Sequence, residues 1–137
     1  MSLFRTPQVI LFSNDLPRAV AFYARLGFTE TFRVPTDGEP IHVDLALDGY
    51  KIGIASVVST RDDHGLDPIG EGQRAAVILW TDDTAAAYED IVASGAPALA
   101  SPHVWLGRLL IGWTADPDGN PIQIVQSLAP PAATTRQ

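Results

Sequence analysis

Residues 9–12 read Val-Ile-Leu-Phe, and residues 77–80 read Val-Ile-Leu-Trp. The two tetrapeptides are 68 residues apart, as the numbers 9 and 77 show. The same offset joins three further pairs: Asp15 with Asp83, Ala19 with Ala87, and Gly27 with Gly95. A match of four residues alone is weak evidence, but its agreement with three more pairs at one offset indicates an internal repeat.

Each copy of the repeat predicts a strand, a turn and a helix. In the first copy a strand is expected over residues 8–13, then Asp15 as the helix cap, with Pro17 tolerated in the first turn. Apolar residues then follow at helical spacing before a glycine that can end the helix: Ala19, Phe22, Tyr23, Leu26 and Gly27. The second copy predicts the same plan, with a strand over 75–81, a cap at Asp83, an apolar face of Tyr88, Ile91 and Val92, and a stop at Gly95.

After each helix the apolar residues alternate with a period of two, which is typical of strands. Strands are expected over residues 29–34, 41–47 and 51–58, and again over 98–101, 108–115 and 121–127. Each half holds an Asp-Gly hairpin signal, Asp48-Gly49 and Asp118-Gly119. Their offset is 70, which predicts two inserted residues between helix and hairpin. The sequence therefore predicts an α+β fold of two tandem βαβββ modules.

The length of 137 residues suits one domain. We expect module one over about 7–58, a polar and Gly-rich linker loop over about 59–74, module two over about 75–127, and a frayed tail over 128–137.

Composition excludes several classes of protein. There is no cysteine, so a disulfide framework, a thiolate zinc site and a cysteine nucleophile are excluded. The formal net charge of −7 argues against nucleic-acid binding, which requires clustered Lys and Arg. No apolar run reaches the roughly 18 residues of a membrane span, and the first residues lack the pattern of a secretory leader. A cytoplasmic protein without membrane contact is expected.

Two segments resemble the vicinal-oxygen-chelate superfamily, the glyoxalase, bleomycin-resistance and dioxygenase family. The first is Asn14-Asp15-Leu16 with the apolar helix that follows, and the second is Asp116-Pro117-Asp118-Gly119-Asn120-Pro121-Ile122. The resemblance covers roughly residues 7–127. It implies an open, curved mixed sheet and, in metal-bearing members, four ligand positions on the concave face.

The resemblance places those four positions at Gln8, Gly53, Ala76 and Gln123. Alanine has no donor atom, glycine offers only its backbone, and neutral amides are poor ligands for transition metals. The sequence therefore predicts a metal-free member of the family, with no cofactor.

Strand alternation then predicts a mostly apolar concave face that carries two amides and two aromatic rings. The expected ligand-binding residues are Gln8, Phe12, Trp80 and Gln123. Trp105 and Arg108 are expected in a ligand-facing loop at the rim, and an edge loop packed on the hairpin is an equal alternative for them. For each of the two rings, Phe12 and Trp80, simple core packing is an equal alternative. His42 and His103 are weaker candidates for a general base, and His64 is expected in a solvated loop.

Two classes of function stay open at this point. The first is a binding protein that holds a small, planar or cationic organic molecule in a metal-free pocket. The second is a lyase, isomerase, hydrolase or dioxygenase-like enzyme with a non-standard or absent metal site, in which His42, His103 or Glu39 transfers a proton. The resemblance also implies a homodimer.

Overall fold

The computed structural model describes residues 3, 6–68 and 75–128. The chain forms two compact units, residues 1–72 and 73–137, and each is described by itself. The first unit contains β1 (Val9–Ser13), α1 (Leu16–Arg25), β2 (Thr29–Val34), β3 (His42–Leu47), β4 (Tyr50–Ser56) and α2 (Val57–His64). The second contains β5 (Val77–Trp80), α3 (Thr84–Ala93), β6 (Ala100–Trp105), β7 (Leu109–Ala115) and β8 (Pro121–Ser127).

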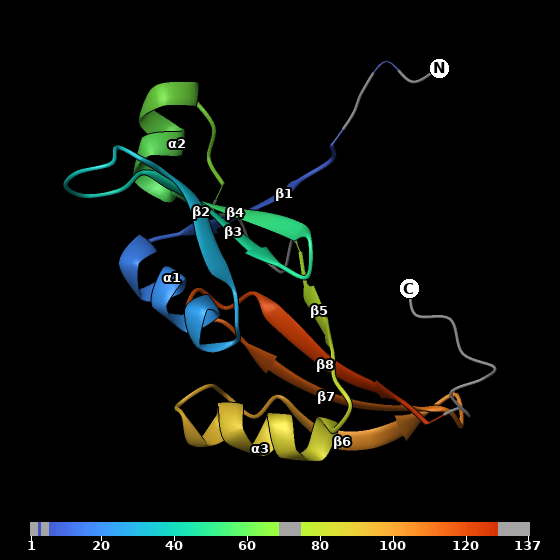
Figure 1. Cartoon of the computed structure of the whole chain (residues 1–137). Coiled ribbons are helices and arrows are strands. Elements are labelled where there is room, and N and C mark those ends of the chain that lie inside the picture. Colours follow the sequence, from blue (N-terminus) through green and yellow to red (C-terminus); the bar gives the residue numbers. More distant parts are fainter. Residues whose placement is uncertain (1–2, 4–5, 69–74, 129–137) are drawn as a thin grey trace. The chain divides into compact units, whose positions relative to one another are not determined.

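Each unit is built on a four-stranded mixed sheet (Figure 1). The strand order is β1-β4-β3-β2 in the first sheet and β5-β8-β7-β6 in the second. In both sheets the first strand pairs in parallel with the last, and the other pairs are antiparallel. The predicted α+β fold of two βαβββ modules is confirmed.

Strand register confirms the repeat residue by residue. Val9 pairs with Ile52, and Val77 pairs with Ile122. Because Asp44 lies opposite Gly53 while Trp113 lies opposite Gln123, β3 and β7 correspond at an offset of 69, the difference between 44 and 113. The prediction that both inserted residues precede the hairpin is therefore wrong for one of them. That residue lies in the hairpin itself, where residues 116–120 take the place of residues 47–50.

The two predicted helix caps are present. The Asp15 carboxylate accepts a hydrogen bond from the Arg18 N–H, and the Asp83 carboxylate accepts one from the Ala86 N–H. Gly27 and Gly95 follow the helices with φ of 107° and 112°, which side chains other than glycine rarely adopt. These local signals explain why the helices begin and end where the sequence predicts.

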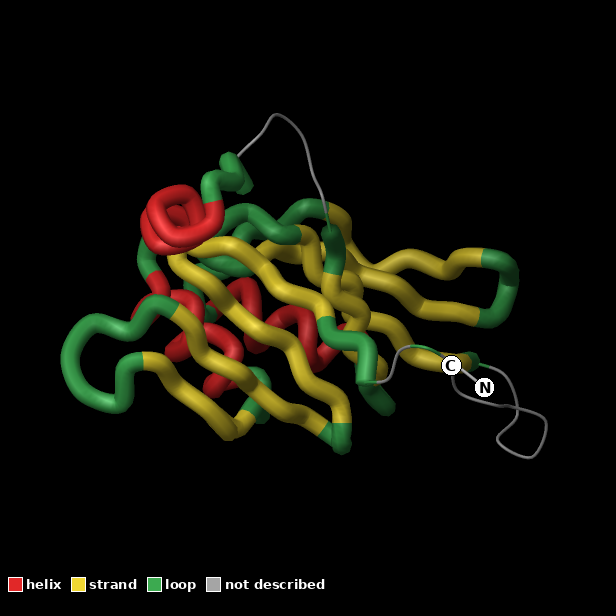
Figure 2. Tube along the Cα trace, turned by 90° about the horizontal axis from the view of Figure 1, so that it is seen from above, coloured by secondary structure: helices red, strands yellow, loops and turns green. Residues whose placement is uncertain are grey.

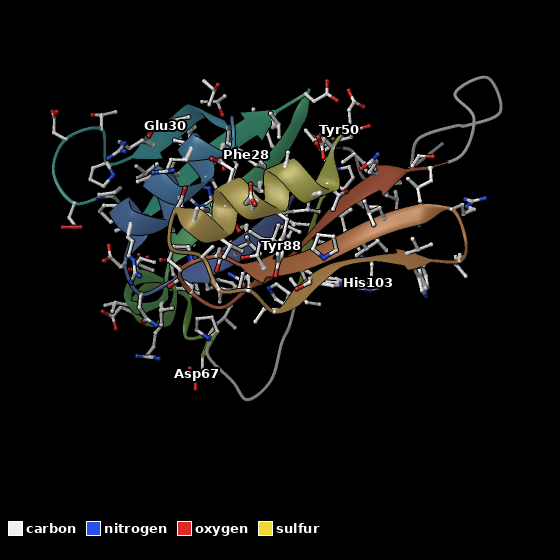
Figure 3. The ribbon with its side chains drawn as sticks, turned by 90° about the horizontal axis from the view of Figure 1, so that it is seen from below. Phe28, Glu30, Tyr50, Asp67, Tyr88 and His103 are labelled. Carbon is white, nitrogen blue, oxygen red and sulfur yellow. The ribbon has the colours of Figure 1, made fainter. Side chains whose placement is uncertain are left out.

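One face of each sheet packs against the helix of its own module. In the first unit α1 packs on β3 and β4, and Tyr23 lies between Phe22 and Phe28 in edge-to-face contacts. In the second unit α3 packs on β7 and β8, with Tyr88 resting on Gly112 (Figure 3). The fully buried side chains of the first core include Val43, Leu45 and Ile54, and those of the second include Ile122 and Ile124.

The expectation of a loop over residues 59–74 is wrong at its start, where α2 forms. The strand expected to reach Val58 ends at Ser56, because the Ser56 hydroxyl accepts a hydrogen bond from the Ser59 N–H and caps α2. His64 is accordingly the last residue of a helix and not part of a loop, and Gly65 ends that helix with φ of 69°. Residues 69–74 and the predicted tail from 129 lie outside the described residues. No described helix is long and apolar enough to cross a membrane.

Candidate functional site

The face of the first sheet opposite α1 carries the polar side chains. Alternation sends Val43, Leu45 and Leu47 toward α1, so His42 and Asp44 project from the other face. Viewed onto the strands, α1 lies behind them and α2 stands at one edge (Figure 2). We call this opposite side the open face of the first sheet.

Three side chains meet on this open face. The Asp44 Oδ1 atom lies 2.7 Å from His42 Nε2 and 2.9 Å from Gln8 Nε2. The side chains of His42 and Asp44 are 27% and 15% exposed, so water reaches both. We call Gln8, His42 and Asp44 the polar cluster. Sequence reasoning named Gln8 and His42 separately and missed Asp44, although its spacing of two from His42 already predicts that both share a face.

Gly53 makes room for the polar cluster. It pairs with Asp44 on β3 and with Ile10 on β1, so it lies between β3, which carries His42 and Asp44, and β1, which begins directly after Gln8. A Cβ atom at Gly53 would lie 3.1–3.2 Å from Gln8 Nε2, His42 Cε1 and Asp44 Oδ1. The predicted ligand positions Gln8 and Gly53 are therefore brought together. The polar cluster occupies the space that a side chain at position 53 would take.

Exposed apolar side chains border the cluster. Ile10 precedes Phe12 on the same side of β1, and Phe32 and Val34 pair with Asp44 and His42 across β2 and β3. Ile10, Phe32 and Val34 are 43%, 52% and 37% exposed, and the Phe32 ring meets the His42 ring edge-on at 6.3 Å. The open face thus combines directed polar atoms with apolar surface, the mixture typical of small-molecule sites.

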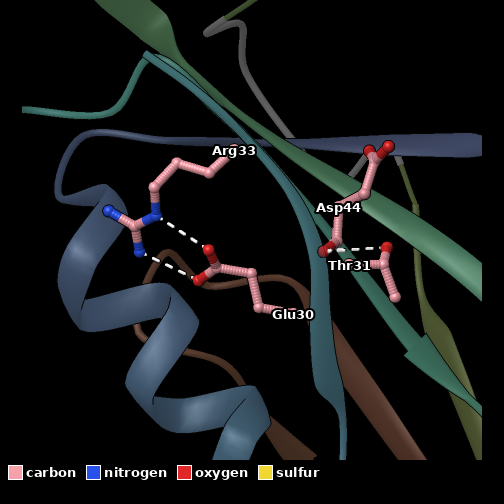
Figure 4. A network of polar contacts seen from close by, with 4 residues as sticks. All are labelled: Glu30, Thr31, Arg33 and Asp44. Atoms are coloured by element: carbon pink, nitrogen blue, oxygen red, sulfur yellow. Dashed lines mark hydrogen bonds and ion pairs between the residues drawn. The ribbon is translucent and has the colours of Figure 1, made fainter. Parts of the chain in front are cut away.

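A bulge in β2 places an ion pair on the face of the first sheet that packs against α1, opposite the open face. The register shifts between Glu30 and Phe32, so Glu30 and Arg33 both fall on the side of α1 (Figure 4). Arg33 donates two hydrogen bonds to Glu30, at 2.8 and 2.9 Å. These hydrogen bonds lower the pKa of Glu30 and raise the pKa of Arg33. The pair is a local feature of the helix side and leaves the polar cluster without a neighbouring guanidinium from β2.

The second sheet presents a different set on the corresponding face. Gln123 lies opposite Trp113, and Trp80 pairs with Val125. Trp113, which sequence reasoning missed, therefore adjoins the predicted Gln123. His103 is in β6, where its Nδ1 hydrogen-bonds the Ser101 carbonyl at 2.8 Å.

The predicted rim residues lie at the tip of the β6–β7 hairpin. Trp105 is the last residue of β6 and not part of a loop, because β6 extends to it and pairs it with Leu109. Arg108 is in the turn that follows, and its N–H donates to the Trp105 carbonyl. Both side chains are exposed. The backbone hydrogen bond across this turn brings the two residues close together, and their part in ligand binding stays a prediction.

Register allows the two modules to be compared position by position. His42 and Asp44 correspond to Ile111 and Trp113, while Gln8 corresponds to Ala76. The second module thus forms the same sheet without any member of the polar cluster. The fold does not require the cluster, and this argues that the cluster serves another purpose.

The four residues predicted at the family's ligand positions offer few donors to a divalent metal ion. Gln8 already donates to Asp44, Gly53 and Ala76 have no donor side chain, and Gln123 offers one neutral amide. Among residues 6–68 and 75–128, no three His, Asp or Glu side chains come together as a ligand set. Metal-dependent steps at these positions therefore lack the imidazole and carboxylate ligands that they need.

Residues 5–124 match the Glyoxalase/Bleomycin resistance protein/Dioxygenase superfamily. The chain belongs to this superfamily. Its resemblance to that family, seen first in the strand-to-helix segment and the last hairpin, is thereby confirmed. A comparison with curated proteins found no match.

Several solved structures share the fold. A glyoxalase/bleomycin resistance protein/dioxygenase from Nocardioides has a TM-score of 0.75 at 19% identity, over 100% of this chain and 92% of that one. TioX from Micromonospora sp. ML1 has a TM-score of 0.72 at 23% identity, over 91% and 100%. A glyoxalase-related enzyme from Fulvimarina pelagi has a TM-score of 0.73 at 22% identity, over 91% and 89%. At these identities the likeness concerns the fold alone.

Proposed function

We propose that this superfamily member binds a small organic molecule without a divalent metal ion, on the open face of the first sheet. The observation that carries the proposal is the polar cluster, in which Gln8 and His42 both contact one oxygen of Asp44. The second module lacks this cluster at corresponding positions, so the cluster is not needed to form the sheet. Its exposed apolar border supplies contact area for the rest of a ligand.

The chemistry of the face favours a neutral ligand over an anion. Asp44 and the formal net charge of −7 both repel negative charge. An amide such as Gln8 can donate and accept, so it suits a carbonyl, amide or hydroxyl group. Phe32, beside His42, offers a ring for a flat apolar part. We therefore expect a neutral molecule with one polar end.

A thermal-shift screen tests this proposal. The protein is first dialysed against EDTA, then screened against neutral metabolites and antibiotics with a flat apolar part. A ligand present at 100 times its dissociation constant raises the free energy of unfolding by about 2.7 kcal/mol. Amide chemical shifts should then move in β1, β3 and β4. Shifts confined to the second unit, or binding that needs an added metal ion, would contradict the proposal.

The second unit keeps four proposed ligand contacts: Gln123, Trp80, Trp105 and Arg108. Gln123 beside Trp113 combines an amide with an indole, which is a second arrangement suited to a flat polar molecule. The chemical-shift map of the same titration decides between the two faces, because each lies in its own unit.

The homodimer is likewise proposed. β1 and β2 are the outer strands of the first sheet, and β5 and β6 are those of the second. Outer strands leave backbone groups available to a partner, and dimers are the commonest assemblies. Light scattering at micromolar concentration should give about twice the 14.7 kDa chain mass. A mass of one chain would contradict the dimer and leave the fold unaffected.

A further inference from the structure

The polar cluster determines which ring nitrogen of His42 is left to act as a base. A carboxylate only accepts hydrogen bonds, so the 2.7 Å contact with Asp44 Oδ1 places the proton on His42 Nε2. The other nitrogen, Nδ1, then carries a lone pair. The same Asp44 oxygen also accepts from Gln8 Nε2 at 2.9 Å, which holds the carboxylate in place.

We propose that His42 is a general base that activates water against a neutral ester or a similarly electrophilic carbonyl compound. Asp44 acts as the positioning residue, because it orients the imidazole and stabilises the positive charge that develops on it. Gln8 supplies an N–H donor, since its amide nitrogen carries two hydrogens and Asp44 uses one. This inference rests on the proposed binding function and adds a reaction to it.

The step balances without any co-reactant other than water. Nδ1 takes a proton from water as the water oxygen bonds to the carbonyl carbon, and the carbonyl electrons move onto oxygen. The Gln8 N–H donates to this oxyanion. When the carbonyl reforms, the bond to the leaving oxygen breaks, and that oxygen receives the proton from the imidazolium. The products are a carboxylic acid and an alcohol.

The exposure of the cluster favours water as the proton donor. The side chains of His42 and Asp44 are partly exposed, and Gln8 is exposed. Removing a proton from carbon instead requires a site that excludes water and stabilises an enolate strongly. The open face provides one amide donor and a base that water can reach. This combination suits the hydrolysis of a carbonyl group that is already electrophilic.

Hydrolysis of p-nitrophenyl acetate by EDTA-treated protein tests the proposal, because this neutral ester has a flat ring for the apolar border. The variants are His42→Gln, Asp44→Asn and Gln8→Ala, with His64→Gln on α2 as the matched histidine control. We expect His42→Gln to lose roughly 100-fold of the rate above buffer, Asp44→Asn and Gln8→Ala to lose about tenfold, and His64→Gln to match the unaltered protein. A normal solvent deuterium isotope effect is expected.

Nitrogen NMR of His42 supplies the readout that separates positioning from folding. The unaltered protein should show the Nε2–H tautomer, and Asp44→Asn should lose that preference while circular dichroism stays unchanged. Equal rates in His42→Gln and His64→Gln would overturn the inference. So would a rate without an isotope effect, with acetylated protein accumulating, because His42 would then be a nucleophile. A ligand from the thermal-shift screen that still binds in these cases leaves the binding proposal intact.

Discussion

Asp44 lies directly opposite Gly53 across β3 and β4, and the space above Gly53 is occupied by the Asp44 carboxylate and its two hydrogen-bond partners. The corresponding pair in the second module is Trp113 and Gln123. The same backbone position thus supports the polar cluster in one module and an amide beside an indole in the other. This divergence at one point of a repeated sheet is the main reason to separate the roles of the two modules.

Substitution of Gly53 by alanine tests the fit of the cluster. A Cβ would lie 3.1–3.2 Å from all three polar side chains, so they must move apart. Because the polar cluster is partly exposed and its side chains can rotate away, we expect a loss of about 1 kcal/mol or less in unfolding free energy. Ligand affinity should fall about tenfold, which corresponds to roughly 1.4 kcal/mol. Denaturant unfolding and calorimetric titration measure the two effects, and unchanged affinity would contradict the assigned site.

Gly112→Ala is the matched control, because Gly112 lies in the second sheet on the face that packs against α3. Its Cβ would lie 2.9 Å from the Tyr88 ring carbon Cδ1, within the packed contact between α3 and β7. We expect a loss of about 1–3 kcal/mol in unfolding free energy, typical of overpacking. The His42 NMR signals should stay as they are in the unaltered protein. A stability equal to that of the unaltered protein would show that α3 does not rest on β7 in this way.

Tyr88→Phe should not destabilise the protein. The Tyr88 hydroxyl is buried and has no hydrogen-bond partner among the residues that the structure describes. An unsatisfied buried polar group costs about 1–3 kcal/mol, so its removal should leave the unfolding free energy equal or raise it by about 1 kcal/mol. A marked loss of stability in urea unfolding would reveal a partner for this hydroxyl.

Asp116 should be essential to the last hairpin. This buried carboxylate accepts hydrogen bonds from the backbone N–H groups of Asp118 and Asn120 and from the Asn120 side chain, at 2.8–2.9 Å. Asp116→Ala should lower the unfolding free energy by about 3 kcal/mol. Asp67→Ala, which removes an exposed ion pair with Arg61, should change it by less than about 1 kcal/mol. Similar losses in both variants would contradict this difference.

The Glu30–Arg33 pair should make a small, pH-dependent contribution. Because the hydrogen bonds from Arg33 lower the pKa of folded Glu30, the stabilisation is present above the ordinary value of 4.5 and is lost as pH falls through the lowered folded value. Glu30→Gln should therefore be slightly less stable than the unaltered protein at pH 7 and equal to it at strongly acidic pH. The effect is small because both side chains are about one-third exposed. A difference that persists at the lowest pH would contradict this account.

Much of the fold follows from local sequence signals. The caps at Asp15 and Asp83, the stops at Gly27 and Gly95, and the alternating strands all act over a few residues, so pattern alone predicts them. α2 was harder to predict because its polar sequence has no apolar face, and the Ser56 cap is its clearest signal. The hairpin insertion required strand register, which the offset between two Asp-Gly pairs does not supply.

The candidate site is harder to predict from the sequence than the fold, because its residues come together only in the folded sheet. Gln8 is far from Asp44 and Gly53 in the chain, and it meets them only because β1 and β3 both pair with β4. Their family positions identified Gln8 and Gly53, but no position in that pattern points to Asp44. Its role appears only when the carboxylate is seen to receive both partners.

The most direct test is the dissociation constant of a ligand from the screen, measured by calorimetry in EDTA-treated protein and in its Gln8→Ala variant, with Gln123→Ala as the counterpart in the second module. Metal-free binding at the polar cluster predicts an unchanged constant after EDTA treatment, a rise of about tenfold in Gln8→Ala, and a smaller change in Gln123→Ala. Loss of binding after EDTA treatment, or a folded Gln8→Ala variant that binds as tightly as the unaltered protein, would contradict it.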